Sequence, residues 1–295
     1  MEYRSFGATN LKVSALGIGC SRLGSFLAKG SEKEVSAMLQ EAVDSGINFF
    51  DTSDIYGQGD SERFLGRTLR VRRDKVIIET KAGNCFSQAA TVATRFKAPI
   101  RVMLKHMPFL RRKVQKIRAA QLSQNFDHGY LATAVEASLR RLQTDYIDVF
   151  MLHSPPSDVI EQGDFLALAD RLKRSGKIRY FGVSCDTGGD ALICLNNPGV
   201  DAIQVPVNSN EQFILKTVLP LAVLRNVGVV ARSPFSSGSI FANTNSSEQT
   251  PNKLGPFTEA QAALMSSASH QGVSVVIAGI SNRRHLRENL HPFAD

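Results

Sequence analysis

Four residues whose side chains can hold charge or transfer protons each follow a short apolar run. The four residues are Asp51, Tyr56, Lys81 and His153. The apolar runs are 47–50, 76–78 and 149–152. Runs of this length are typical of buried strands, so each polar residue is expected beyond the end of a strand. Because the C-terminal strand ends of a parallel β/α barrel converge on one rim, the pattern predicts one shared site.

These residue types suit the reduction of a carbonyl group. When hydride reaches the carbonyl carbon, negative charge develops on the oxygen and a proton donor must meet it. Tyr56 is the predicted donor, and the Lys81 ammonium is expected to lower the pKa of its phenol. Asp51 can pair with Lys81, and His153 can orient the carbonyl. Side chains cannot supply hydride, so an organic cofactor is required.

The elements that must position these residues alternate between strands and helices. Eight predicted strands cover 15–19, 47–51, 76–81, 147–153, 179–185, 202–207, 228–233 and 273–279. Amphipathic stretches predict helices at 32–44, 61–69, 131–142, 159–174, 189–195, 211–224 and 258–270. A turn at 7–10 between two short strands predicts an N-terminal β-hairpin. This order predicts an α/β fold, a (β/α)8 TIM barrel forming a single domain over residues 1–295.

The positive charge of this chain is concentrated in one segment. The net charge is +8, yet nine basic residues and no acidic residue fall within residues 84–126. Without those nine, 26 basic residues face 27 acidic ones. We interpret residues 84–126 as a basic insertion after the third barrel strand. It could form a solvated helical insertion, a lid over an anionic substrate, or a surface for acidic lipid or nucleic acid; no nucleic-acid partner is expected for the chain as a whole.

The remaining composition indicates a globular protein. Hydrophobic residues make up 43% and charged residues 21% of its 295 residues. The N-terminus lacks the features of a signal peptide and no run of 18 apolar residues occurs, so we expect a cytoplasmic protein without a transmembrane segment. The four cysteines show no CxxC pair, and the six histidines show no metal-binding spacing. We therefore predict free thiols and no metal. The glycines at 17, 19 and 24 do not fit the spacing of a dinucleotide-binding Rossmann motif.

The motifs FDTSDIYG at 50–57, ETK at 79–81 and MLHSP at 151–155 resemble the aldo-keto reductase superfamily. The resemblance also includes GQGDSE at 57–62, TDYID at 144–148 and GVS at 182–184. It implies the barrel fold, the four catalytic residues above and a nicotinamide dinucleotide cofactor. NADP is favoured over NAD, because Arg283 or Arg284 could meet a 2′-phosphate.

The resemblance also implies where the cofactor binds. Ser184 and Gln204 correspond to residues that hold the nicotinamide carboxamide. Residues 233–238 resemble the loop beside the pyrophosphate, and residues 279–289 resemble the adenosine-binding stretch. The expected cofactor-binding residues are Ser184, Gln204, Ser233, Phe235, Ser236, Gly238, Gly279, Ser281, Arg283, Arg284, Glu288 and Asn289. Two residues depart from the family pattern: Cys185 replaces the usual asparagine, and Val207 replaces a tyrosine that stacks on the nicotinamide.

Three hypotheses for the function follow. The first is an NADP-dependent oxidoreductase that reduces an aldehyde or ketone, with a sugar-like or otherwise polar compound as our guess for the substrate. The second is an NAD-linked dehydrogenase that oxidises an aldose or polyol. The third is a cofactor-binding regulatory protein with little turnover, which the departures at Cys185 and Val207 would favour.

Overall fold

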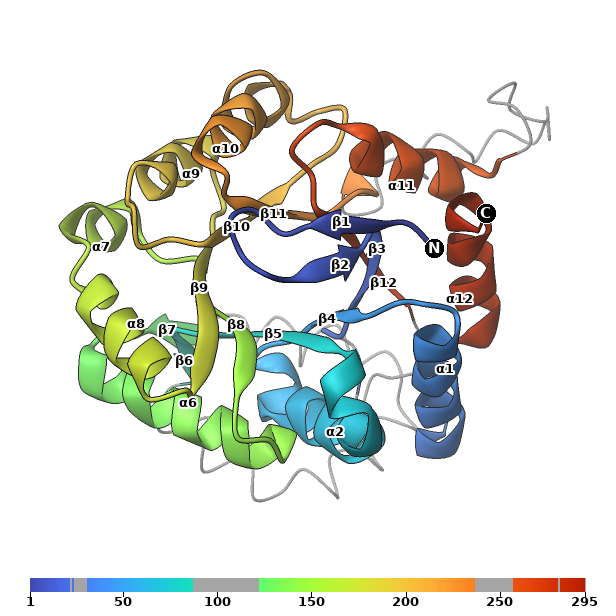
Figure 1. The fold of residues 1–295 in the computed structure, drawn as a ribbon, viewed down its shortest axis with the longest axis horizontal. Coiled ribbons are helices and arrows are strands. Elements are labelled where there is room, and N and C mark those ends of the chain that lie inside the picture. Colours follow the sequence, from blue (N-terminus) through green and yellow to red (C-terminus); the bar gives the residue numbers. More distant parts are fainter. Residues whose placement is uncertain (22, 24–30, 87–121, 237–256, 281, 295) are drawn as a thin grey trace.

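The computed structural model describes residues 1–21, 23, 31–86, 122–236, 257–280 and 282–294. In this part of the chain, eight parallel strands close into a barrel in the order β10-β11-β12-β3-β4-β5-β8-β9 (Figure 1). The barrel strands are β3 (Leu16–Gly19), β4 (Phe49–Asp51), β5 (Ile77–Ala82), β8 (Ile147–His153), β9 (Ile178–Ser184), β10 (Ala202–Pro206), β11 (Gly228–Arg232) and β12 (Val275–Gly279). The predicted (β/α)8 barrel is confirmed.

The N-terminal hairpin covers the end of the barrel at which the parallel strands begin. Strands β1 (Tyr3–Ser5) and β2 (Lys12–Ser14) pair antiparallel and cross the front of the barrel in Figure 1. Buried side chains of the hairpin region pack against the inward-facing residues near the strand starts. Together they form an apolar cluster inside the barrel. This inner cluster includes Phe6, Leu11, Val13, Phe49, Ile77, Val149, Ala202, Val230 and Val275. The half of the barrel interior near the strand starts is therefore apolar, and the hairpin closes it.

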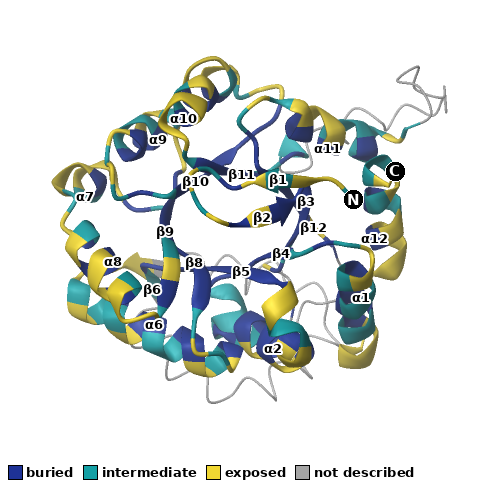
Figure 2. Cartoon of the chain, viewed as in Figure 1, coloured by how far each residue is buried: buried dark blue, intermediate teal, exposed yellow. Residues whose placement is uncertain are grey.

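A second and larger apolar cluster lies between the strands and the surrounding helices, and the strands are correspondingly buried in Figure 2. The helices are α1 (Glu32–Asp44), α2 (Asp60–Leu69), α6 (His128–Leu142), α7 (Ser157–Gln162), α8 (Phe165–Arg174), α9 (Gly188–Leu195), α10 (Leu219–Arg225), α11 (Glu259–Ser269) and α12 (Arg283–Leu290). Short helical turns are η1 (Tyr56–Gln58), η2 (Arg70–Lys75), η4 (Ile214–Val218) and η6 (His291–Phe293). Burial on both faces explains why the strand sequences are continuously apolar.

Two predicted helices differ from the observed ones. The helix expected over 159–174 is split into α7 and α8, because Gly163 ends α7 with a left-handed backbone (φ +68°). Glycine adopts this conformation at no steric cost and often terminates helices. The helix expected over 211–224 begins as the π-helical segment η4 and continues as α10 to Arg225.

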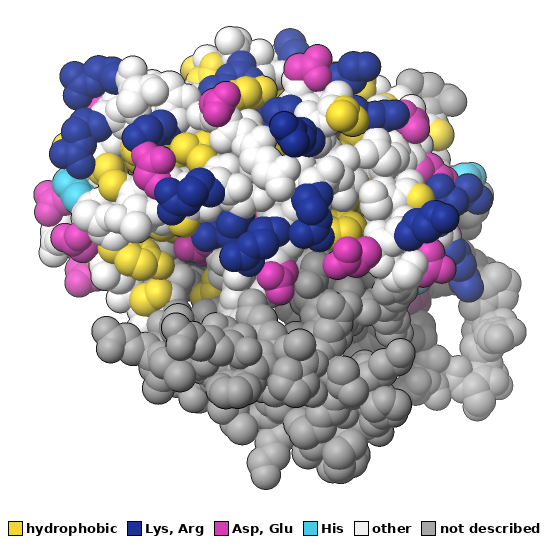
Figure 3. Space-filling view, turned by 90° about the horizontal axis from the view of Figure 1, so that it is seen from below, with side chains coloured by type: hydrophobic (Ala, Val, Ile, Leu, Met, Phe, Trp, Pro, Cys, Tyr) yellow, Lys and Arg dark blue, Asp and Glu magenta, His cyan; other side chains and the backbone are white. Residues whose placement is uncertain are grey.

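The basic insertion lies mostly outside the described residues. Its flanks, β6 (Asn84–Phe86) and β7 (Leu122–Gln124), form an antiparallel pair beside the barrel. All nine basic residues fall within 87–121, which is not described. On the described surface of the face in Figure 3, Lys and Arg side chains are interspersed with Asp and Glu.

Candidate active site

Side chains alternate between the two faces of each barrel strand, and this brings polar side chains together inside the barrel near the C-terminal strand ends. Successive residues of a strand point to opposite faces, so residues two apart share a face. The inward residues change from apolar at the strand starts to polar at the C-terminal ends. These polar residues are Asp51 on β4, Glu79 and Lys81 on β5, His153 on β8, Ser184 on β9, Gln204 on β10 and Arg232 on β11.

A buried ion pair forms the floor of this site. The Lys81 ammonium is completely buried and donates a hydrogen bond to Oδ1 of Asp51, as the sequence predicted. It also donates to the backbone carbonyl of Thr52 at 3.1 Å. Burial opposes the charge on Lys81, but the neighbouring carboxyl groups of Asp51 and Glu79 outweigh this effect and raise its pKa. Lys81 is therefore protonated at neutral pH.

Glu79 is a member of the site that our sequence reasoning missed. Its side chain is fully buried, and its Oε1 lies 3.1 Å from Nζ of Lys81. Burial and the neighbouring Asp51 raise the pKa of Glu79, whereas burial of Asp51 is outweighed by Lys81, which lowers the pKa of Asp51. We infer that Glu79 is neutral and Asp51 ionised. The signal was available, because Glu79 precedes Lys81 by two residues on the same strand.

Tyr56 and His153 lie above this pair. Tyr56 belongs to the turn η1 after β4, and its ring centroid lies 5.7 Å from Nζ of Lys81. The rings of Tyr56 and His153 meet edge to face, with centroids 5.8 Å apart. The Nδ1 atom of His153 is 3.1 Å from the hydroxyl of Ser53. The structure thus brings all four predicted catalytic residues together.

Burial dominates the protonation of both rings. It raises the pKa of Tyr56 to about 12, although the Lys81 ammonium acts in the opposite direction. Lys81 therefore lowers the pKa of Tyr56 as expected, but burial of the ring has the larger effect and raises the pKa overall. Burial and the Lys81 charge lower the pKa of His153 to about 3. Around neutral pH the site holds a protonated phenol and a neutral imidazole.

Ser184 and Gln204 meet at the centre of the barrel. The Ser184 hydroxyl donates to Oε1 of Gln204 at 3.1 Å. The Gln204 amide nitrogen donates to Asp51 at 3.0 Å and to Glu79 at 2.9 Å. Both amide hydrogens are thereby used, but Oε1 keeps a second lone pair. An amide N–H of a ligand could therefore be accepted at Gln204.

The two residues that depart from the family pattern face away from this interior. Cys185 and Val207 are buried in the outer cluster between strands and helices. The thiol of Cys185 lies 3.6 Å from that of Cys194 on α9. Val207 follows β10, and its side chain packs in the outer cluster rather than toward the barrel interior.

The other predicted cofactor-binding residues follow β11 and β12. Ser233 and Ser236 have left-handed backbones (φ +56° and +45°), and Phe235 packs against the outer cluster. Gly279 ends β12, and a Cβ atom there would meet nothing within 4 Å. Gly238 and Ser281 lie outside the described residues. Strained backbone at non-glycine residues is common at functional sites, which is consistent with a binding role for this rim.

The predicted adenosine-side residues lie on α12 and already have partners. Arg283 forms an ion pair with Glu41 of α1 at 2.8 Å, and Arg284 pairs with Glu288 at 2.7 Å. Arg284 is 85% exposed, so its pair is weak and can be exchanged for another anion. Asn289 is largely buried beside them.

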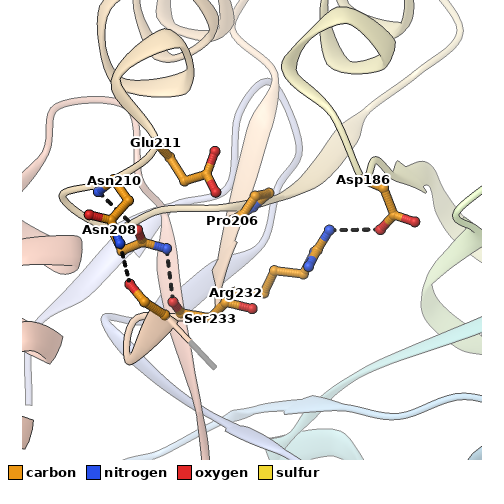
Figure 4. A pocket seen from close by; sticks show the side chains of 8 residues that line it. Asp186, Pro206, Asn208, Asn210, Glu211, Arg232 and Ser233 are labelled. Atoms are coloured by element: carbon orange, nitrogen blue, oxygen red, sulfur yellow. Dashed lines mark hydrogen bonds and ion pairs between the residues drawn. The ribbon is translucent and has the colours of Figure 1, made fainter. Parts of the chain in front are cut away.

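A cavity of about 410 Å³ opens at the ends of β9, β10 and β11 (Figure 4). Arg232 crosses it and pairs with Asp186 at 2.8 Å, while Asn208 donates to the carbonyl oxygen of Ser233 at 3.1 Å. Arg232 was not predicted from the sequence, although it follows the inward-facing Val230 by two residues at a strand end. The cavity also contains Ser236, so it adjoins the predicted cofactor loop.

Among the described residues, no group of three or more His, Cys, Asp and Glu side chains could hold a metal ion. All four cysteines are free thiols, as expected. No described helix has the length and apolarity needed to cross a membrane.

Comparisons with known proteins give a consistent result. The family model described as "Aldo/keto reductase family" matches residues 15–294. L-galactose dehydrogenase of Arabidopsis thaliana is 28% identical over 98% of this chain and 87% of its own. An aldo-keto reductase of Bacillus halodurans, solved in its holo form, is 26% identical, with a TM-score of 0.75 over 100% of this chain and 91% of its own. An aldo/keto reductase of Klebsiella pneumoniae in complex with NADP and acetate shares the fold at 21% identity, with a TM-score of 0.70 over 100% and 91% of the chains.

Proposed function

Since this chain belongs to the aldo/keto reductase family, we propose that it is an NADPH-dependent oxidoreductase that reduces an aldehyde or ketone, with Tyr56 as general acid. One observation carries the proposal: a buried, protonated Lys81 held by Asp51 lies beneath the rings of Tyr56 and His153. This arrangement combines a proton donor, a neutral hydrogen-bonding ring and a fixed positive charge in one place.

The roles of the side chains follow from their charge states. Bound NADPH would supply the hydride. As negative charge develops on the carbonyl oxygen, the Tyr56 hydroxyl donates its proton and becomes a phenolate. The Lys81 ammonium stabilises that phenolate because the site is buried and screening is weak. Neutral His153 donates from Nε2 to the carbonyl oxygen and orients it, which requires Ser53 to donate to Nδ1.

The chain's own residues suit an NADP cofactor at several points. The free lone pair of Gln204 and the hydroxyl of Ser184 can receive the carboxamide, and Ser233 and Ser236 can face the phosphates. The exposed Arg284 could exchange Glu288 for a 2′-phosphate. The Klebsiella pneumoniae protein that shares this fold was crystallised with NADP.

The first experiment is a titration with NADPH and NADH, followed by the fluorescence of the cofactor because the chain has no Trp. Turnover with small aldehydes is then compared in Tyr56→Phe and in the control Tyr3→Phe, whose ring is half exposed at the hairpin. Loss of a general acid should lower kcat by about 10²- to 10⁴-fold, with the Kd of NADPH unchanged. Equal kcat in Tyr56→Phe and wild type would refute the assigned role.

A second candidate is an NAD-linked dehydrogenase that oxidises an aldose or polyol. One observation favours it: Arg283 and Arg284 are already paired with acidic residues rather than open to a phosphate. The Arabidopsis thaliana relative, named for L-galactose dehydrogenase activity, agrees with this direction. Tighter binding of NADH than of NADPH would favour this alternative, whereas binding of either without turnover would favour a regulatory role.

A further inference from the structure

Ser53 joins His153 to a carboxyl group outside the four proposed catalytic residues. It lies in the loop between β4 and η1, it is fully buried, and its hydroxyl is within hydrogen-bond distance of three groups. These are Nδ1 of His153 at 3.1 Å, Oδ1 of Asp54 at 3.2 Å and the backbone carbonyl oxygen of Lys81 at 3.2 Å. A hydroxyl has a single hydrogen, so Ser53 donates to one of these groups at a time.

The group that receives this hydrogen decides which tautomer His153 adopts. In the neutral ring, one nitrogen carries a hydrogen and the other accepts. If Ser53 donates to Nδ1, the ring hydrogen is on Nε2, which can then donate to a substrate carbonyl. If Ser53 donates elsewhere, Nδ1 must donate to Ser53, and Nε2 becomes an acceptor. A carbonyl oxygen has no hydrogen to offer, so only the first tautomer can orient the substrate.

The charge of Asp54 controls where the Ser53 hydrogen goes. An ionised carboxylate only accepts hydrogen bonds, whereas a protonated carboxyl group also donates one. Beside ionised Asp54, the Ser53 hydroxyl should donate to the carboxylate, because hydrogen bonds to charged acceptors are the stronger ones. Beside protonated Asp54, Ser53 can accept from the carboxyl group and donate to Nδ1 of His153. The Lys81 carbonyl is a neutral acceptor at every pH and does not change this difference.

The surroundings of Asp54 allow its charge to change near neutral pH. It is faced by Glu62 of α2 and by Arg141 and Tyr130 of α6, and Tyr130 is in turn faced by Cys85 of β6. Arg141 is already engaged in an ion pair with Glu62 at 2.5 Å. Burial and the Glu62 charge therefore outweigh Arg141 and raise the pKa of Asp54 to about 7.

We propose that Asp54 is a positioning residue that acts on the substrate carbonyl through Ser53 and His153. Its protonated form leaves Nε2 of His153 as a donor, and its ionised form leaves Nε2 as an acceptor. On ionisation, one proton leaves Asp54 for solvent and the ring hydrogen moves from Nε2 to Nδ1, so the imidazole stays neutral. The proposal rests on the proposed carbonyl reduction and adds a pH-dependent control to it.

The first test follows kcat for aldehyde reduction between about pH 6 and pH 9 at saturating NADPH. Neither Tyr56, with a pKa of about 12, nor His153, with a pKa of about 3, changes charge in this range. In wild type, kcat should fall by about tenfold to a hundredfold as Asp54 ionises, the effect of losing one hydrogen bond to the developing oxyanion.

The variants identify the group responsible for this fall. Asp54→Asn cannot ionise, and its amide can still donate to Ser53, so the fall with pH should disappear. The control Glu136→Gln removes a half-exposed carboxylate on α6 and should leave the wild-type profile unchanged. An equal fall in Asp54→Asn and wild type would overturn the proposal, because another group, such as the 2′-phosphate of the cofactor, would then be titrating.

A double variant tests whether Asp54 acts through Ser53. Without the Ser53 hydroxyl, Asp54 has no link to His153, so adding Asp54→Asn to Ser53→Ala should not change kcat further at any pH. Independent, additive effects of the two substitutions on kcat at pH 9 would overturn this route.

Nitrogen-15 NMR of the imidazole shows the tautomer without any turnover. In the protein without cofactor, His153 should carry its hydrogen on Nε2 at pH 6 and on Nδ1 at pH 9, whereas Asp54→Asn should keep it on Nε2. His153→Gln identifies the signals among those of six histidines. The same tautomer at both pH values in wild type would overturn the proposal. A tautomer change without reduction of any aldehyde would support the role of Asp54 and refute the reductase function.

Discussion

Removing both carboxyl groups beside Lys81 should cost much more stability than the two single removals predict. Asp51 and Glu79 both contact the fully buried ammonium of Lys81. In Asp51→Asn, Glu79 can ionise and replace the lost charge, because the like charge that raised its pKa is gone. In Glu79→Gln, Asp51 remains. Each single variant keeps one ion pair and should lose about 1–2 kcal/mol of unfolding free energy.

The double variant leaves a buried ammonium without a carboxylate. Loss of the partner of a buried charge costs about 3–5 kcal/mol by itself, so the double variant should lose about 4–6 kcal/mol. The coupling energy between the two sites is then about 2 kcal/mol, well above the roughly 0.5 kcal/mol expected for independent sites. This excess measures how far the two carboxyl groups can substitute for each other.

Urea unfolding followed by far-UV circular dichroism at pH 7 provides the assay. In the double variant, burial should lower the pKa of folded Lys81 below its unfolded value near ~10.4. The unfolded state then binds more protons, so its unfolding free energy should rise with pH by up to about 1.4 kcal/mol per unit below pH 10. Additive losses, or a pH slope equal to that of wild type, would refute the inference that the two groups share one ammonium.

Two further predictions concern residues beside the catalytic rings. Ser53→Ala removes the hydroxyl that lies 3.1 Å from Nδ1 of His153. The variant should lower kcat about tenfold with little change in KM, because the imidazole loses the partner that fixes its tautomer. An unchanged kcat would exclude this role for Ser53. Burial and the nearby Glu62 raise the pKa of Asp54 to about 7, so folded Asp54 contributes stability below about pH 4 that is lost as pH rises to 7. Asp54→Asn should therefore gain about 2–4 kcal/mol over wild type between pH 4 and pH 8 in urea unfolding, and a pH-independent difference would contradict the shift.

Most of the barrel, and the convergence of the four proposed catalytic residues at one rim, could be predicted because the necessary signals are local. Apolar runs mark buried parallel strands, and the residue that follows each run lies at the rim. The same alternation could have identified Glu79 and Arg232, each two residues after an inward apolar residue. It could also have shown that Val207 does not face the barrel interior, because Val207 lies three residues after the inward Gln204 and hence on the opposite face.

Other features depend on tertiary contacts that no local pattern contains. The pair between Arg232 and Asp186 joins two strand ends that are 46 residues apart. The pKa of Tyr56 depends on how completely the fold buries its ring, and burial outweighs the charge of Lys81. The split between α7 and α8 did have a local signal, namely Gly163. A glycine within an amphipathic pattern does not always end a helix, however, so this signal was ambiguous.

Strand β5 carries separate polar networks on its two faces. Lys81 and Glu79 face the barrel interior, whereas Thr80 donates outward to the buried Glu62 of α2. A deletion or insertion of one residue just before β5 would exchange these faces, placing Thr80 beside Asp51 and turning Lys81 toward the helices. A one-residue shift of β5 would therefore remove Lys81 from the proposed active site and also break the hydrogen bond that links β5 to α2. We expect insertions and deletions to be tolerated in the rim loops but not next to β5.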